Sequence, residues 1–119
     1  MFDCFWGSYP INWKHQSTVN KNGVKYEEIP LVDNKELHNF EFVVDGYRSF
    51  IDYVIKYDLV YLIHTEVAPE LEGKGVASAM VNKTLELLES ENRQIVPRCS
   101  YILSFLERHP EWKKMVAHA

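Results

Sequence analysis

The stretch that decides the fold is IHTEVAPELEGKGVASAM, residues 63–80. An apolar run ends in this stretch, two glycines follow, and a helical pattern begins. This order predicts a row of free backbone amides at a helix N-terminus, where the aligned peptide dipoles also favour negative charge. The stretch therefore predicts a binding site for a cofactor that carries phosphate.

Three β-rich segments precede the glycine turn. They are residues 37–45, 47–56 and 59–66. In the first segment Phe40, Phe42 and Val44 alternate with other residues and so share one face of a strand. The dipeptide Asp45-Gly46, which comes next, is typical of a tight hairpin turn. We expect three antiparallel strands in a meander.

The hydrophobic period changes after the glycine turn. Residues 75–91 repeat apolar side chains at steps of three and four, which predicts an amphipathic helix. Ile95-Val96 then predicts a short strand, which a right-handed crossover places parallel to the strand before the helix. A shorter helical pattern starts near Tyr101 and stops before Pro110. The predicted fold class is α+β, or α/β, with a mixed sheet.

The first 35 residues do not fit this scheme. We therefore divide the chain into an N-terminal extension, residues 1–35, and one domain, residues 36–119. The extension begins with an aromatic cluster: Phe2, Phe5, Trp6, Tyr9 and Trp13. Exposed aromatic side chains are costly unless they are covered. The extension is thus either an arm that packs on the domain or a segment that docks a partner.

Composition and length exclude several classes of protein. The chain has 119 residues, of which 46% are apolar, so it has room for a single domain with one core. Its net charge of −4 gives no support to binding of nucleic acid or of an anionic membrane. The longest apolar run, Leu59–Ile63, is too short to cross a bilayer, and the N-terminus does not resemble a signal peptide. We expect a cytoplasmic protein, either a monomer or a homodimer.

Cysteine and histidine spacing predicts no metal site. The cysteines, Cys4 and Cys99, are separated by nearly the whole chain, and a reducing cytosol would keep them as thiols. No CxxC or HxxxH pair is present. We therefore expect neither a disulfide nor a bound metal.

Three local motifs resemble the GCN5-related N-acetyltransferases, and in particular the small group that keeps only the family's core. The motifs are His64–Val67, the turn Leu71–Ala77, and Val96–Tyr101 followed by residues 108–110. The resemblance covers residues 36–116 and implies an acetyltransferase that uses acetyl-CoA. A P-loop or a dinucleotide-binding turn would need GxxxxGK[ST] or GxGxxG, and the chain has neither.

In this family the turn follows the pattern Q/RxxGxG/A, and its amides bind the pyrophosphate of acetyl-CoA. Gly73 and Gly75 match the glycines of the pattern. Glu70 stands at the first position and Glu72 where a basic residue is common, so both depart from it. The residues that the resemblance implies for cofactor binding are Val67, Leu71, Glu72, Gly73, Lys74, Gly75, Val76 and Ala77.

Acetyl transfer to an amine needs a base, and often an acid that protonates the leaving thiolate. His64 and Glu66 lie two apart on a strand, so they share a face and either could be the base. The alternatives are a hydrogen-bonded core histidine and a solvated carboxylate. Tyr101 lies close to the place where larger members of the family have a tyrosine that protonates the thiolate, so the resemblance implies this role. The alternative is that its side chain only packs in the core.

Cys99 is a further catalytic candidate. It follows the predicted parallel strand and precedes a helical segment, and a thiol near a helix N-terminus can have a lowered pKa. The resemblance implies a cysteine that accepts the acetyl group, whereas most free cysteines are small buried hydrophobes. We expect an acetyl-CoA-dependent N-acetyltransferase that acts on a small-molecule or peptidic amine. The alternative is a non-catalytic module that binds CoA or acetyl-CoA.

Overall fold

Two tight turns build the centre of the sheet in the computed structural model, which describes residues 19–117. Asp45 and Gly46 have φ angles of 53° and 84°, and Tyr57 and Asp58 have 53° and 62°. Positive φ at both central residues is what a type I′ hairpin turn requires. The strands are β1 (Leu31–Asn34), β2 (Asn39–Val44), β3 (Tyr47–Lys56), β4 (Leu59–Glu66) and β5 (Gln94–Pro97).

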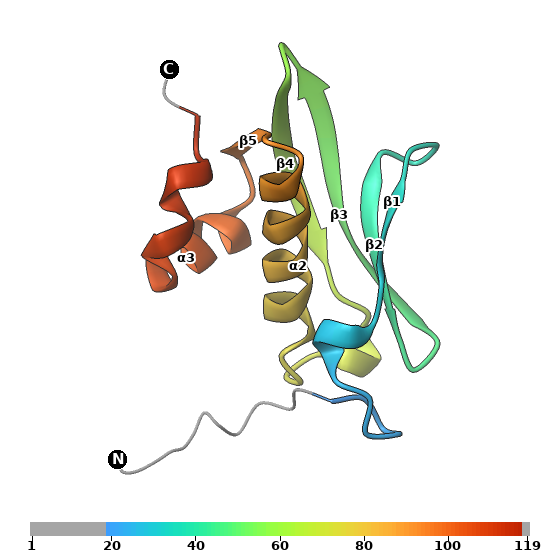
Figure 1. Cartoon of the computed structure of the whole chain (residues 1–119). Coiled ribbons are helices and arrows are strands. Elements are labelled where there is room, and N and C mark those ends of the chain that lie inside the picture. Colours follow the sequence, from blue (N-terminus) through green and yellow to red (C-terminus); the bar gives the residue numbers. More distant parts are fainter. Residues whose placement is uncertain (1–18, 118–119) are drawn as a thin grey trace, which may run out of the picture.

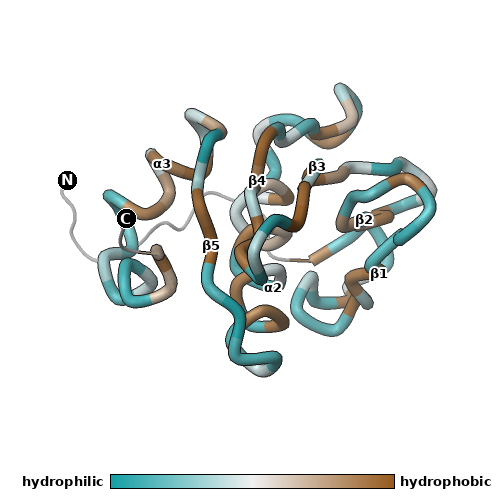
Figure 2. The backbone as a smooth tube through the Cα atoms, turned by 90° about the horizontal axis from the view of Figure 1, so that it is seen from above, coloured by the Kyte–Doolittle hydropathy of each residue, from teal (hydrophilic) through white to brown (hydrophobic). Residues whose placement is uncertain are grey.

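The five strands form one mixed sheet in the order β1-β2-β3-β4-β5 (Figures 1 and 2). The first four pair antiparallel, and β5 pairs parallel to β4. The predicted α+β class, the meander and the parallel strand are therefore confirmed. Phe40, Phe42 and Val44 lie on one face, as predicted, and at most 2% of each is exposed.

Helix α2 (Val76–Ser90) connects β4 to β5 and covers the face of the sheet that carries these residues (Figure 1). Met80, Val81 and Leu85 are fully buried against the sheet. The helix ends where Asn92 takes a φ of 57° and the Arg93 amide donates to the Leu88 carbonyl. The predicted amphipathic helix is confirmed.

Helix α3 (Ser100–Arg108) lies beside α2, on the other side of it from β3 (Figure 1). It buries Ile102, Phe105 and Leu106 in the core. The chain then forms a 3-10 helix, η4 (Pro110–Met115), which sequence analysis did not predict. After η4 the Ala117 amide donates to the Ile95 carbonyl, so the end of the described chain lies along β5.

Residues before the predicted domain also belong to the sheet. The 3-10 helix η2 (Tyr26–Glu28) places the Tyr26 ring edge-on to Phe42, and β1 pairs with β2 along its whole length. The predicted boundary between residues 35 and 36 thus falls between two paired strands, and residues 26–34 pack on the domain. The aromatic cluster of residues 2–13 lies outside the described residues.

Candidate functional site

Strands β4 and β5 separate at one end of the sheet. Their pairing runs from Leu59 opposite Gln94 to Leu62 opposite Pro97, and the last link is the Arg98 amide, which donates to the Leu62 carbonyl at 2.8 Å. Strand β4 continues to Glu66 without a β5 partner. The sheet is therefore open between Ile63–Glu66 and the start of α3.

A β-bulge in β4 decides which side chains face this gap. Tyr53 pairs with Leu62 and Asp52 with His64, so Ile63 is an extra residue and the alternation of faces shifts by one. As a result Thr65, opposite buried Ile51, lies on the α2 side of the sheet. His64 and Glu66 lie on the opposite side, which we call the outer face.

A cavity of about 420 Å³ lies on the α2 side of the gap, between the start of α2 and α3. Both Thr65, on β4, and Arg108, at the end of α3, line it. Every residue that sequence analysis proposed for cofactor binding lines it except Lys74, and so does Tyr101. The lining residues are Thr65, Val67, Leu71, Glu72, Gly73, Gly75, Val76, Ala77, Ser78, Tyr101 and Arg108.

The glycine turn presents the N-terminus of α2 to this cavity. After the 3-10 helix η3 (Pro69–Leu71), Gly73 and Gly75 take φ angles of 78° and 79°, which side chains rarely adopt. Gly75 is the N-cap, no side chain caps the helix, and its first turn has no acidic residue. The first helical amides lack acceptors within the helix. They are free to bind an anion.

Cys99 is the N-cap of α3, with only 8% of its surface exposed, and it does not line the cavity, whereas Thr65 does. Its thiol donates to Thr65 Oγ1 at 3.4 Å. Burial raises the pKa of the Cys99 thiol. Once the sulfur is ionised it can only accept hydrogen bonds, from the Thr65 hydroxyl, which then turns to donate, and from the backbone amides at Ile102 and Tyr101. These bonds to the thiolate outweigh burial and lower the pKa below its ordinary value. The site thus holds a thiol that ionises more readily than a free cysteine.

Tyr101 joins the two helices at the cavity. Its hydroxyl lies 3.3 Å from Ser78 Oγ, and the Arg108 guanidinium lies over its ring, 5.7 Å from the centroid. Sequence analysis singled out neither Thr65 nor Ser78. A β-bulge is not visible in the hydrophobic pattern of β4, so no sequence signal placed Thr65 beside Cys99.

His64 and Glu66 contact each other on the outer face, His64 Nε2 to Glu66 Oε1 at 3.2 Å. Their shared face was predicted, and it is confirmed. Both side chains are more than half exposed, and neither lines the cavity. They flank the gap from the side opposite the proposed cofactor-binding residues.

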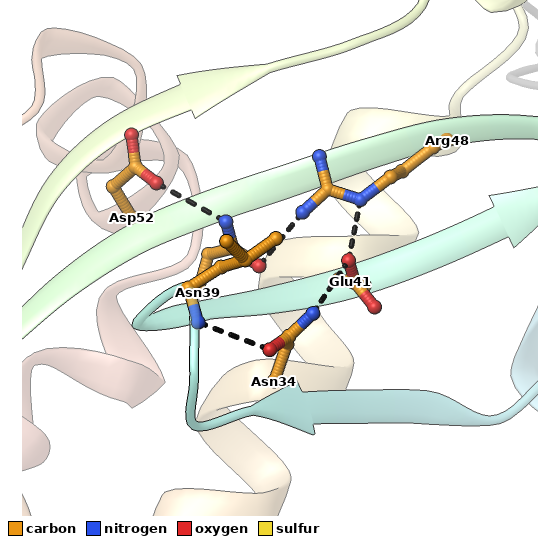
Figure 3. A network of polar contacts seen from close by, with 6 residues as sticks. Asn34, Asn39, Glu41, Arg48 and Asp52 are labelled. Atoms are coloured by element: carbon orange, nitrogen blue, oxygen red, sulfur yellow. Dashed lines mark hydrogen bonds and ion pairs between the residues drawn. The ribbon is translucent and has the colours of Figure 1, made fainter.

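A polar network continues across the outer face (Figure 3). Arg48 donates to Glu41 and, at 2.9 Å, to Asn39 Oδ1, while Asn39 Nδ2 donates to Asp52 at 3.4 Å. Hydrogen bonds from Arg48 and Asn34 hold the pKa of Glu41 below its usual range. Asp52 pairs with His64 across β3 and β4, so the network ends beside the exposed His64–Glu66 pair.

This fold, with a parallel pair of strands that separate beside an uncapped helix, defines an acyltransferase class. The family described as GCN5-related N-acetyl-transferase matches residues 39–115 of the chain. The solution structure of a GCN5-like protein from Staphylococcus aureus superposes with a TM-score of 0.58 at 20% sequence identity, over 76% of this chain and 90% of that one. The chain belongs to the GCN5-related N-acetyltransferase family.

Membership makes the chain an acyltransferase of a family that generally uses acetyl-CoA. Within residues 19–117, no three histidine, cysteine, aspartate or glutamate side chains gather as a metal site would need. No helix in the same range is long and apolar enough to cross a membrane.

Proposed function

We propose that this chain binds acetyl-CoA in the cavity between α2 and α3 and transfers the acetyl group to an amine of a small molecule or a peptide. One observation carries the proposal: the cavity in front of the uncapped α2 N-terminus extends to Thr65 at the β4–β5 gap. The amides of Val76, Ala77 and Ser78 would hold the pyrophosphate. The backbone of Val67, at the end of β4, would pair with the pantetheine arm.

The charges around the cavity are compatible with a pyrophosphate. Glu72 lines the cavity and opposes an anion, whereas Glu70 does not line it. Arg108 lines it as well, and among residues 19–117 it has no carboxylate partner. Its guanidinium would supply a positive charge in the same cavity as the Glu72 carboxylate.

A second cavity, of about 660 Å³, lies next to the first and shares Gly75, Ser78 and Arg108 with it. Lys25 and Lys83 stand on its wall. The Lys83 ammonium donates to the Glu27 carbonyl at 2.8 Å and is fixed over this cavity. The adenosine end of the cofactor would lie here, where Lys25, Lys83 and Arg108 outnumber the carboxylates of Glu27 and Glu86.

The amine would approach from the outer face, because the cofactor fills the other side of the gap. There the His64–Glu66 pair is exposed to solvent and can take the proton that the attacking amine loses. Tyr101 lines the cofactor cavity and would donate a proton to the departing CoA thiolate. The products are the acetylated amine and CoA in its thiol form.

Cys99 adds a covalent route. In that route the Cys99 thiolate attacks the thioester carbonyl, an Sγ–C bond forms, and the bond between that carbon and the CoA sulfur breaks. The amine then attacks the acetyl-cysteine, which releases the amide and returns the proton to the thiol. The lowered pKa of Cys99 and its hydrogen bond with Thr65 support this route.

One experiment tests these steps together. The full chain and its Cys99→Ala and Cys4→Ala variants are mixed with acetyl-CoA, and thermal stability, intact mass and release of CoA thiol to a panel of amines are followed. We expect a thermal shift, turnover with at least one amine, and an added acetyl group in all forms except Cys99→Ala. Absence of a thermal shift with both CoA and acetyl-CoA would contradict the proposal.

Two other results assign narrower roles. A thermal shift without turnover or acetylated protein would identify a binding module instead of an enzyme. Turnover that Cys99→Ala leaves intact would exclude the covalent route and keep direct transfer to the amine. The cytoplasmic location and the monomeric or homodimeric state are predictions. Size-exclusion chromatography with light scattering tests the oligomeric state.

A further inference from the structure

A third cavity, of about 570 Å³, lies at the other end of α2 from the acetyl-CoA site. The end of the helix forms one wall, with Leu88, Glu91 and Arg93, and strands β2 to β4 and the end of β1 form the others. Because α2 has 15 residues, the two sites are separated by about 22 Å of helix. No residue lines both this cavity and either of the other two.

An aromatic pair, Phe40 and Tyr53, forms the apolar wall of this cavity, with 2% and 6% of their surfaces exposed, respectively. The Phe40 and Tyr53 rings are stacked, with centroids 4.5 Å apart and planes 30° apart, and Val60 and Leu88 continue the apolar surface. The volume lies within the range of about 300–1,000 Å³ that is usual for small-molecule sites. These features fit the apolar body of a small planar ligand.

Two carboxylates, Asp33 and Glu91, and two cations, Lys35 and Arg93, line the cavity. The Tyr53 hydroxyl donates to Asp33 at 2.6 Å, and Glu91 lies 3.7 Å from Arg93 Nε. Among residues 19–117, the buried Arg93 Nη1 has no hydrogen-bond partner and Lys35 has no ion pair. A buried donor without an acceptor is rare in proteins and points to a group that the chain itself does not supply.

The last carbonyls of α2 near this cavity are partly covered by the chain itself. A helix C-terminus carries partial negative charge on its last carbonyls. In this chain the amides of Glu91 and Arg93 donate to the carbonyls of Leu87 and Leu88, so the chain itself covers these acceptors. The cationic groups in the lining are the Lys35 ammonium and the Arg93 guanidinium, whose Nη1 is a different nitrogen from the Nε that faces Glu91.

We infer that this cavity binds a small carboxylate with a flat apolar body, held by the Arg93 guanidinium and the Lys35 ammonium and packed on the Phe40–Tyr53 stack. The ligand site is separate from the acetyl-CoA site and does not depend on it. A guanidinium binds a carboxylate with two parallel hydrogen bonds, so a modest turn of the Arg93 side chain would give Nη1 its missing acceptor.

The test is an NMR titration of the full chain with benzoate, benzyl alcohol and benzylamine, three probes that differ mainly in charge. Benzoate should shift the amides of Lys35, Phe40 and Tyr53 in a saturable manner, and the two other probes should bind at least tenfold more weakly. Equal binding of benzyl alcohol, tighter binding of benzylamine, or no saturable shift with benzoate would overturn the inference.

Variants separate the cavity from other anion sites. Arg93→Gln should weaken the binding of benzoate at least tenfold. Lys35→Gln, at an exposed position that does not put folding at risk, should weaken this binding severalfold. The matched controls Arg108→Gln, in the acetyl-CoA site, and Lys113→Gln, on the surface, should leave it unchanged. Loss of binding in Arg108→Gln, or unchanged binding in Lys35→Gln and in a folded Arg93→Gln, would overturn the assignment.

Discussion

The hydrogen bond between Thr65 and Cys99 makes a quantitative prediction about the thiol. Thr65→Val removes the hydroxyl that lies 3.4 Å from Cys99 Sγ and keeps the shape of the side chain. One such hydrogen bond contributes about 0.5–1.5 kcal/mol, and one pKa unit corresponds to about 1.4 kcal/mol. Loss of this hydrogen bond should therefore raise the pKa of Cys99 in the variant and reduce the fraction of thiolate at neutral pH.

The assay is the rate of alkylation by iodoacetamide, followed by intact mass from acid to alkaline pH in a Cys4→Ser background. Because the thiolate is the reactive form, a higher pKa lowers the rate at neutral pH by about three- to tenfold. The direction of the pKa change determines how the rate of alkylation of the variant differs from that of the wild type across the pH range. The deficit is largest below both pKa values and disappears above both, where the thiol is ionised in either protein.

Thr84→Val is the matched control, since it removes the same hydroxyl from a buried threonine that donates to the Met80 carbonyl and does not contact Cys99. The Thr84→Val variant should have the same pH profile of alkylation as the wild type. The reasoning fails if Thr65→Val and Thr84→Val have the same profile. It also fails if the Thr65→Val deficit persists at high pH, because that result would indicate changed access to the thiol.

Three further predictions concern the turn, the core and the sheet. Gly75→Ala and Gly23→Ala should each lower the free energy of unfolding by about 1 kcal/mol, since both glycines have φ near 80°. Only Gly75→Ala should weaken the binding of acetyl-CoA, measured by calorimetry. Leu85→Ala should cost about 2–5 kcal/mol in urea unfolding, because this side chain is fully buried beneath the sheet. The difference in absorbance between wild type and Tyr53→Phe should show a phenol that ionises at about pH 12, because burial and the Asp33 carboxylate raise the pKa of Tyr53.

Each of these has a clear contrary outcome. Equal loss of acetyl-CoA affinity in both glycine variants would assign the effect to general destabilisation. A cost below about 1 kcal/mol for Leu85→Ala would mean that α2 is not packed as described. A Tyr53 phenol that ionises at its ordinary pH would contradict its burial and its hydrogen bond with Asp33.

Local patterns made most of the fold predictable. Asp45-Gly46 adopts the turn that its residue types favour, and the alternation of Phe40, Phe42 and Val44 specifies the buried face of β2. The change of period after Gly75 marks the start of α2, since a helix and a strand bury side chains at different spacings. These signals act over a few residues, so the sequence alone displays them.

Other features depend on contacts between distant residues. Strand β1 has four residues, two of them polar, and its pairing with β2 is what makes it a strand. The bulge at Ile63 reverses the faces of β4, so the side chain that reaches Cys99 is Thr65 and not its neighbours. Ser78 joins the site because Tyr101 packs against it from another helix. No local pattern contains this information.

The most direct test of the account is an NMR titration of the full chain with acetyl-CoA. The account predicts saturable shifts at the amides of Gly73, Gly75, Val76 and Ala77 and at Tyr101, with no shift at Lys35 or Tyr53 in the distant cavity. Absence of saturable shifts, or shifts that leave the α2 N-terminus unaffected, would contradict the claim that this turn holds the pyrophosphate of acetyl-CoA.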